Sequence, residues 1–278
     1  MKTMIKYIER DLKFFQFSLA LGFMKKLILL AVLFILIGCS ESYLDLEDRV
    51  KFQAEKSSSQ ISFLQIKRDA YYILQWSKDD AFQDEINEFK KLDSISPPEK
   101  GSILFTGSSS IRFWNSLEKD MKPLKVLNRG FGGAHISHVI HHFKDIVEPY
   151  DPKAIVFFCG TNDLTALKSP EETIDDFKEF LNLARKNLKD IKVYVIGIKP
   201  SVSRLYLDEQ EKTYNSSISA LANEDPSLEY IDVWNSMLNN DGTRMSELYI
   251  EDGLHMNEKG YEVWTKLVRE TLAKDFNL

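Results

Sequence analysis

From residue 102 onward, short apolar runs alternate with longer stretches that have a helical pattern. Five runs stand out: "SILFT", "KVLNR", "KAIVFFC", "KVYVIGI" and "LEYIDV". Most of them are almost continuously hydrophobic and rich in Val, Ile and Phe, which is typical of strands covered on both faces. Strands that alternate with helices build βαβ units. The pattern therefore predicts a parallel sheet with helices packed on both sides.

The stretches between these runs carry helix signals. Ser169, Pro170 and Glu172 supply an N-cap, a proline in the first turn and the glutamate of a capping box. The segment before the first strand has apolar residues at helical spacing and ends at two prolines, which cannot continue a helix. The predicted helices span residues 78–93, 136–147, 169–188 and 208–224, with a last one capped by Asn257.

The N-terminus has the pattern of an export signal. Lys25 and Lys26 precede an apolar run of eleven residues, which is too short to span a bilayer but suits a signal peptide. The run ends in "LIGC", which resembles a bacterial lipobox. We therefore expect a signal peptide over residues 1–38, with Met24 as an alternative start, and a lipid on Cys39. The alternative interpretation is an uncleaved signal anchor with an incidental cysteine.

The lipobox implies a lipoprotein of the bacterial cell envelope, facing the periplasm or the cell surface. Residues 39–77 would be a lipid-anchored tether and N-terminal extension, and residues 78–278 the main domain. The 278-residue chain has a net charge of −6, and loss of six basic and two acidic residues with the signal peptide lowers it to −10. Such a balance argues against nucleic acid as a partner and leaves the lipid as the only membrane attachment. Cys159, in an apolar run, is expected to be a buried free thiol.

Small and polar residues follow the predicted strands, where ligands bind in parallel sheets. They are "GSSS" after the first strand, "NRGFGG" after the second, "GTND" after the third, and "EDGLHMN" before the last helix. A serine becomes a nucleophile when a base removes its proton and hydrogen-bond donors stabilise the oxyanion. His255 is a candidate base, and Asp252 lies three residues before it, a spacing that lets a carboxylate reach the far ring nitrogen.

These four segments resemble, in chain order, the motifs of the SGNH (GDSL-type) hydrolases, over about residues 82–272. The resemblance implies Ser109 as nucleophile, His255 and Asp252 as its partners, and an oxyanion hole built from the backbone N–H groups of Ser109 and Gly133 and the Asn162 amide. It also implies a flavodoxin-like three-layer α/β/α sandwich with a five-stranded parallel sheet in the order 2-1-3-4-5. Ser108 departs from the aspartate of the best-known form of the family, and Ser110 is a rival nucleophile.

The implied activity is that of a serine esterase that hydrolyses carboxylic esters through an acyl-enzyme, without a metal or an organic cofactor. Short-acyl esters or O-acetyl esters of carbohydrates are the favoured substrates, and a small molecule or a glycan is the expected partner. Cleavage of lysophospholipids or thioesters would use the same residues. An alternative from another class is a catalytically silent lipoprotein that binds glycans with the same fold.

Several further residues have a structural and a functional interpretation. His135, His138 and His142 lie on one predicted helix face, where a packed or solvated face is favoured over a metal site because no carboxylate or cysteine motif accompanies them. Ser110 is expected to cap a helix, and Asp163 to close an Asx turn. Arg112 and Trp114 are expected to take part in helix packing. Arg204 and Tyr206 are expected to border the substrate site.

Overall fold

The computed structural model describes residues 43–57, 61–78 and 80–278. The predicted signal peptide and Cys39 therefore lie outside the described residues. The chain divides into two units, residues 1–48 and 49–278, and the second contains the sheet. Residues 43–56, predicted as part of a polar tether, are helical. Within the described part, no helix has both the length and the apolar character needed to cross a membrane.

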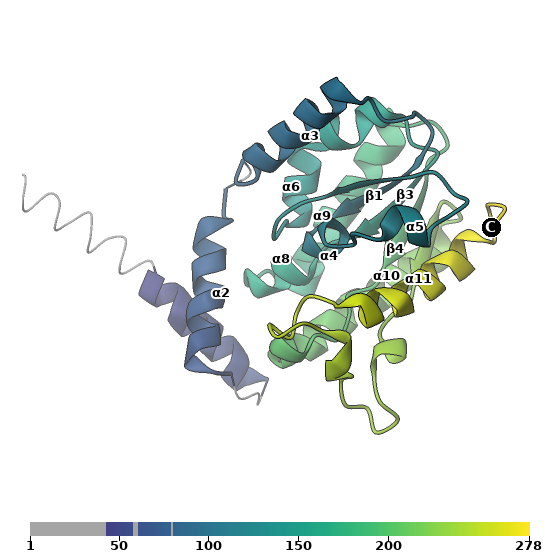
Figure 1. Ribbon diagram of the computed structural model, residues 1–278. Coiled ribbons are helices and arrows are strands. Elements are labelled where there is room, and N and C mark those ends of the chain that lie inside the picture. Colours follow the sequence, from purple (N-terminus) through teal and green to yellow (C-terminus); the bar gives the residue numbers. More distant parts are fainter. Residues whose placement is uncertain (1–42, 58–60, 79) are drawn as a thin grey trace, which may run out of the picture. The chain divides into compact units, whose positions relative to one another are not determined.

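Five parallel strands form one sheet in the order β2-β1-β3-β4-β5 (Figure 1). This order and the three-layer architecture confirm the predicted fold. Each strand falls within one of the five apolar runs or ends one residue beyond it, since strands buried on both faces need continuous apolar sequence. The strands are β1 (Ile103–Gly107), β2 (Val126–Gly130), β3 (Ala154–Phe158), β4 (Lys192–Ile196) and β5 (Leu228–Ile231).

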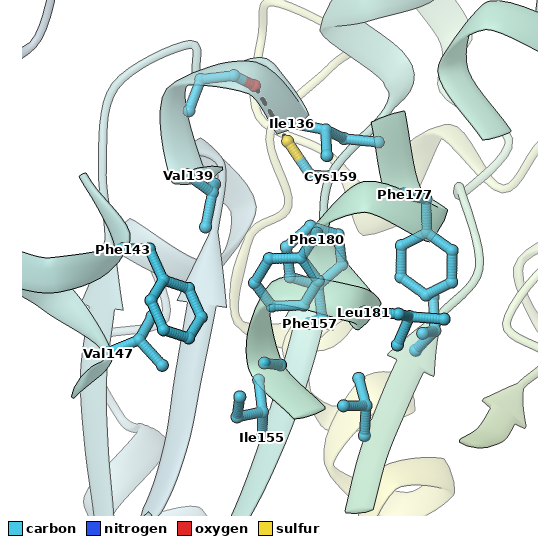
Figure 2. Packing of buried hydrophobic residues seen from close by; sticks show 14 of the residues in the cluster. Ile136, Val139, Phe143, Val147, Ile155, Phe157, Cys159, Phe177, Phe180 and Leu181 are labelled. Carbon is cyan, nitrogen blue, oxygen red and sulfur yellow. Dashed lines mark hydrogen bonds between the residues drawn. The ribbon is translucent and has the colours of Figure 1, made fainter. Parts of the chain in front are cut away.

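One face of the sheet packs against the larger of two hydrophobic clusters. Figure 2 shows its centre, where the Phe157 ring from β3 stacks on Phe180 at 4.4 Å between centroids. Cys159 is buried there as a free thiol, as predicted, and donates to the Ala134 carbonyl at 3.1 Å. The helices of this side are α3 (Gln83–Ile95), α6 (Ile136–His141), α7 (Phe143–Ile146), α8 (Thr161–Thr165), α9 (Pro170–Asn187) and α10 (Asp208–Glu224).

A second cluster fills the opposite face, around the buried rings of Trp114 and Trp264. Its helices are α4 (Ser109–Arg112), α5 (Leu117–Asp120) and α11 (Glu258–Leu272). Asn257 caps α11, and its side chain accepts hydrogen bonds from the N–H groups of Lys259 and Gly260. The capping box at Ser169 is formed as predicted. The expected helix over residues 136–147 is interrupted at His142, which ends α6 and precedes α7.

Before the sheet, α2 (Phe63–Gln75) begins after its N-cap Ser62. The next helix, α3, starts at residue 83 rather than 78, because the chain first turns at residues 80–83. Short 3-10 turns occupy the connections, namely η1 (Glu148–Tyr150), η2 (Val202–Leu207), η3 (Asn235–Met237) and η4 (Ser246–Leu248).

The end of β1 requires a glycine. Gly107 has a φ of +125°, and a Cβ atom added there would lie 2.0 Å from the carbonyl oxygen of Phe158 on β3. The same oxygen accepts the N–H of Ser108 at 2.9 Å. Only a residue without a side chain fits this close approach. The turn directs the chain out of the sheet and into α4, which begins with Ser109.

Candidate active site

Ser109, His255 and Asp252 meet at the carboxyl end of the sheet. The His255 Nε2 atom lies 2.9 Å from the Ser109 Oγ atom, across 146 residues of sequence. On the other side of the ring, Nδ1 lies 2.6 Å from Asp252 Oδ2. Both distances are those of hydrogen bonds. The structure thus joins the three side chains that the sequence singled out into one continuous line.

The Asp252 carboxylate is held from two directions. While Oδ2 faces the imidazole, Oδ1 accepts the backbone N–H groups of Leu254 and His255 at 2.8 and 2.9 Å. Burial raises the pKa of a carboxyl group, but the hydrogen bonds from the His255 ring and from these two N–H groups outweigh it and lower the pKa of Asp252 to about 2. An ionised Asp252 accepts from Nδ1, which leaves Nε2 as the acceptor that faces the Ser109 hydroxyl.

Phe113 supports the imidazole from the side. Its ring meets that of His255 edge-on, with 4.9 Å between centroids and 90° between planes. Phe113 follows α4 directly, so the element that carries Ser109 also restricts the ring of His255.

The three predicted oxyanion donors line the same cleft as Ser109 and His255. Ser109 is the first residue of α4, and its N–H belongs to the helix-terminal donors that have no partner within a helix. Asn162 donates from Nδ2 to the Ala134 carbonyl at 3.1 Å, and the amide has a second hydrogen for another acceptor. Gly133 lines the cleft beside these residues. The structure therefore brings the predicted oxyanion donors to the same cleft as the predicted nucleophile and base.

The cleft has a volume of about 400 Å³ and a mixed wall of aromatic and charged side chains. One side of the wall comes from α2 and the residue after it, through Arg68, Tyr72 and Trp76. The rings of Tyr72 and Trp76 stack at 4.3 Å, nearly parallel. Trp76 also covers Gly133 so closely that a Cβ atom there would lie 2.0 Å from the indole.

This contribution of α2 was not predicted, because residues 39–77 were interpreted as a tether and extension. The signal that could have revealed it is the spacing of Asp69, Tyr72 and Trp76, which puts three partly or fully buried residues on one helix face. Arg112, expected to pack within a helix, instead lines the cleft and pairs with Glu85 at 3.2 Å.

The serines beside Ser109 have different surroundings. Ser110 is buried, and its Oγ accepts from the Lys199 Nζ at 3.0 Å. Burial, together with nearby Arg204, lowers the pKa of the Lys199 ammonium to about 7. The N-cap of α4 is Ser108, so the prediction that Ser110 caps the helix is wrong. Ser110 does not line the cleft that contains Ser109.

His135, His138 and His142 are buried at α6 and its two ends, which agrees with the favoured interpretation of a packed face. The His138 Nδ1 accepts the backbone N–H of His135 at 2.9 Å, and its Nε2 lies 2.9 Å from the Lys78 carbonyl oxygen. Burial, followed by the charges of His138, Lys168 and Arg204, lowers the pKa of His135 to about 3. Across residues 43–57, 61–78 and 80–278, no group of three His, Cys, Asp or Glu side chains is arranged to hold a metal ion.

Two residues near the site have roles other than those expected. Instead of closing a local turn, the buried Asp163 carboxylate accepts the N–H of Ile136 on α6 at 3.1 Å, which ties α8 to α6. Tyr206 does not line the cleft; its hydroxyl donates to Asp69 on α2 at 2.7 Å. Arg204 does line the cleft, as expected, although its side chain is almost entirely buried.

Comparison with known proteins identifies a matching family model and a curated relative. The model of the GDSL-like lipase/acylhydrolase family matches residues 100–263, which is more than half of the chain. The N-acylneuraminate cytidylyltransferase of Escherichia coli O18:K1:H7 (strain RS218 / NMEC) is 25% identical over 233 residues, covering 83% of this chain and 51% of that protein. The chain thus spans about half the length of the curated relative it matches.

Solved structures have the same fold. A GDSL-like lipase from Bacteroides thetaiotaomicron VPI-5482 aligns with a TM-score of 0.59 at 20% identity, covering 69% of this chain and 98% of the other. An acetyl xylan esterase aligns with a TM-score of 0.51 at 18% identity, covering 62% of this chain and 99% of the other. At such identities the likeness establishes the architecture.

Proposed function

The chain belongs to the GDSL-like lipase/acylhydrolase family, and from that membership we propose that it is a serine esterase with Ser109, His255 and Asp252 as its catalytic residues. His255 takes the Ser109 proton at Nε2 as Oγ attacks the ester carbonyl carbon. The oxyanion is stabilised by the N–H groups of Ser109 and Gly133 and by the Asn162 amide. His255 then protonates the leaving alcohol, the carbonyl re-forms, and an acyl-enzyme remains.

Water completes the cycle. His255 removes a proton from a water molecule, whose oxygen attacks the acyl carbon; the ester bond to Ser109 breaks, and the serine oxygen regains its proton from His255. Asp252 keeps the imidazole in one tautomer and stabilises the imidazolium in both halves. The observation that carries the proposal is the unbroken hydrogen-bonded line from Asp252 through His255 to Ser109, beside a cleft that also contains Asn162 and Gly133.

We propose short-acyl esters, and O-acetyl esters of carbohydrates in particular, as the substrates. A volume of about 400 Å³ suits a small acyl group with part of its alcohol better than a long acyl chain. Stacked aromatic rings beside charged groups suit the mixed apolar and polar faces of a sugar. The likeness in fold to an acetyl xylan esterase agrees with this choice.

Turnover of p-nitrophenyl acetate tests the chemistry. We expect hydrolysis by the wild-type protein, loss of turnover in Ser109→Ala, and near wild-type rates in Ser110→Ala, the matched control one residue away. A fluorophosphonate probe should label the wild type and Ser110→Ala but not Ser109→Ala. Background rates for all three proteins would instead favour the silent glycan-binding alternative. Labelling that depends on Ser110 would exclude Ser109 as nucleophile.

A panel of esters tests the substrate class. Acetylated sugars, longer acyl esters, lysophospholipids and thioesters are compared at equal concentration by kcat/KM. We expect the acetylated sugars to give the highest values. A preference for lysophospholipids or thioesters would assign the same residues to those reactions.

We further propose that the protein is attached to the cell envelope by a lipid on Cys39. The support is the sequence of residues 25–42, in which an apolar run ends in a lipobox-like segment followed by polar residues. Labelled palmitate should be incorporated by the wild type and not by Cys39→Ser. Equal incorporation by both would remove the proposal.

A further inference from the structure

Arg204 is a buried arginine behind the oxyanion donors. It lies in η2, where its backbone angles of −120° and 31° are non-helical and interrupt the turn. This kink directs the Arg204 side chain inward, where it is 2% exposed, while the next residue, Leu205, is 46% exposed. A buried guanidinium is costly unless its N–H groups find acceptors. Its partners therefore indicate what it does.

Two of these partners belong to the start of α8. The Arg204 Nη1 atom donates to Thr161 Oγ1 at 3.0 Å, and Nη2 donates to Asn162 Oδ1 at 3.1 Å. Thr161 in turn donates from its hydroxyl to the carboxylate of Glu211, which is fully buried on α10, at 2.9 Å. The guanidinium is thus linked to a buried acid through one hydroxyl, and its second arm is directed at an oxyanion donor.

These contacts define the orientation of the Asn162 amide. A guanidinium can only donate, so the group that faces Arg204 must be the amide oxygen. A carbonyl can only accept, so the group that faces Ala134, 3.1 Å away, must be the amide nitrogen. Rotating the amide by half a turn would set two donors against each other on one side and two acceptors on the other. Arg204 and Ala134 together therefore leave one orientation, with the second N–H of the amide free for the cleft.

We propose that Arg204 is a positioning residue for the oxyanion hole: its guanidinium holds Asn162 by the amide oxygen, so that the amide N–H is fixed and polarised toward the developing oxyanion. The inference rests on the proposed esterase function, in which Asn162 is one of the three donors. A hydrogen bond from a charged donor withdraws electron density from the amide oxygen and makes its N–H groups stronger donors. A fixed donor also needs no reorganisation when the oxyanion forms.

The segment that carries Arg204 is braced on two sides. From α2, the Gln65 amide donates to the carbonyl of Ser203, and Asp69 accepts the hydroxyl of Tyr206 at 2.7 Å. From the loop that contains Asp252, the carbonyl of Gly253 accepts the N–H of Ser203 at 3.0 Å. These contacts flank Arg204 in sequence. They connect the position of the guanidinium both to α2 and to the loop that orients His255.

A double-mutant cycle tests the proposal on the full-length protein, with p-nitrophenyl acetate as substrate. Asn162→Ala should lower kcat by about 100-fold to 1000-fold, the usual effect of losing one oxyanion donor. Arg204→Gln should lower kcat by about 10-fold or more with little change in KM. If Arg204 acts through Asn162, the double variant should be within about threefold of Asn162→Ala alone, because the two changes remove the same stabilisation.

Arg129→Gln is the matched control. Arg129 is also buried, donates to the Tyr150 hydroxyl at 2.7 Å and pairs with Asp93, but does not line the cleft. Its removal should leave kcat of the folded protein close to that of the wild type. In addition, guanidinium chloride at a non-denaturing concentration should restore part of the kcat lost in Arg204→Ala and should not affect Asn162→Ala.

The proposal is overturned if Arg204→Gln has wild-type kcat, or if the change lowers kcat by the same factor with Asn162 present and absent. If Arg204→Gln is recovered unfolded, Arg204→Lys takes its place in the cycle, since lysine keeps the charge but cannot bridge Thr161 and Asn162 in the same way. Failure of the esterase function itself would appear as an inactive wild type and would remove both proposals. An active wild type with additive variants removes only this one.

Discussion

The substitution Asp252→Asn tests how the imidazole is oriented, because the two oxygens of Asp252 have different partners. An amide can keep its oxygen toward the backbone N–H groups of Leu254 and His255, which now hold Oδ1 at 2.8 and 2.9 Å. Its nitrogen then faces His255 Nδ1, which must accept. The ring proton moves to Nε2, and the Ser109 hydroxyl has no base.

The reactive tautomer requires the opposite orientation of the amide. Its oxygen would accept from Nδ1, and its nitrogen would face the two backbone N–H groups, which would lose their acceptor. Leaving a buried donor unpaired costs about 1–3 kcal/mol, and these two donors are part-buried, so their loss costs at most about 2–6 kcal/mol. At 1.36 kcal/mol per tenfold change in rate, this range corresponds to a loss of about 30-fold to 25,000-fold. The imidazolium also loses its carboxylate, so we expect the upper part of the range, about 1000-fold to 10,000-fold.

The assay is kcat for p-nitrophenyl acetate at neutral pH, where the carboxylate of Asp252 is ionised because its pKa is about 2. Glu251→Gln is the control, since it makes the same change of charge on the exposed neighbouring residue. We expect Glu251→Gln to have wild-type kcat. The fluorophosphonate probe should label Asp252→Asn much more slowly than the wild type, because labelling needs the same activated hydroxyl.

An Asp252→Asn protein within tenfold of the wild type, in a preparation where Ser109→Ala is inactive, would refute this reasoning. It would mean that the imidazole keeps its tautomer without the carboxylate. An equal loss of activity in Glu251→Gln would attribute the effect to the charge of the loop instead of the hydrogen bond.

Three other predictions concern the cleft and the scaffold. Trp76→Ala should raise KM for acetylated sugars by about twofold to tenfold, which corresponds to the typical energy of one aromatic contact, and should leave kcat for p-nitrophenyl acetate near wild type. Tyr71→Ala, at an exposed position, is the control and should change neither value. Gly107→Ala should lower the free energy of unfolding in urea by about 2 kcal/mol or more, because the added Cβ atom clashes with β3. Gly101→Ala should lower it by less, since Gly101 also has a positive φ but an added Cβ atom there has no neighbouring atom within 4 Å. Equal losses in the two variants would contradict the clash with β3. Burial lowers the pKa of His135 from 6.5 to about 3, so between pH 6.5 and 3 the residue binds a proton only in the unfolded state, and the stability that it contributes above pH 6.5 is lost as the pH falls toward 3. This loss has a maximum slope of about 1.4 kcal/mol per pH unit, and His135→Asn should reduce the slope of the free energy of unfolding against pH. An unchanged slope would assign the acid sensitivity to other groups.

The fold could be predicted because its signals are local. The strands β1, β3 and β4 are apolar runs covered on both faces, and caps such as Ser169 and Asn257 lie within four residues of the N–H groups they satisfy. The helix over residues 136–147 was less well predicted, because its periodicity continues through His142 although the backbone does not. Periodicity describes which side chains face the core and contains no information on such a break.

The candidate site also has a part that local sequence indicates and a part that it does not. Motifs of a few residues were enough to single out Ser109, Asn162 and His255, since each lies in a short segment whose residue types suit the chemistry expected of it. The contact between Arg204 and Asn162 and the cover that Trp76 forms over Gly133 depend on which loops become neighbours in three dimensions. No local pattern specifies those neighbours. The part of the wall that α2 forms and the contact of Arg204 with Asn162 were therefore missed, although the sequence singled out the three side chains that the structure brings together.

The wide sequence separation of Ser109 and His255 has a consequence for biosynthesis. A chain that emerges from its N-terminus exposes the serine long before the imidazole, which arrives just ahead of the closing helix α11. Until that helix docks on the sheet, the hydroxyl has no proton acceptor. Under the proposed mechanism, unfinished or truncated chains lack the base for Ser109, and ester cleavage would report that the last part of the molecule has folded.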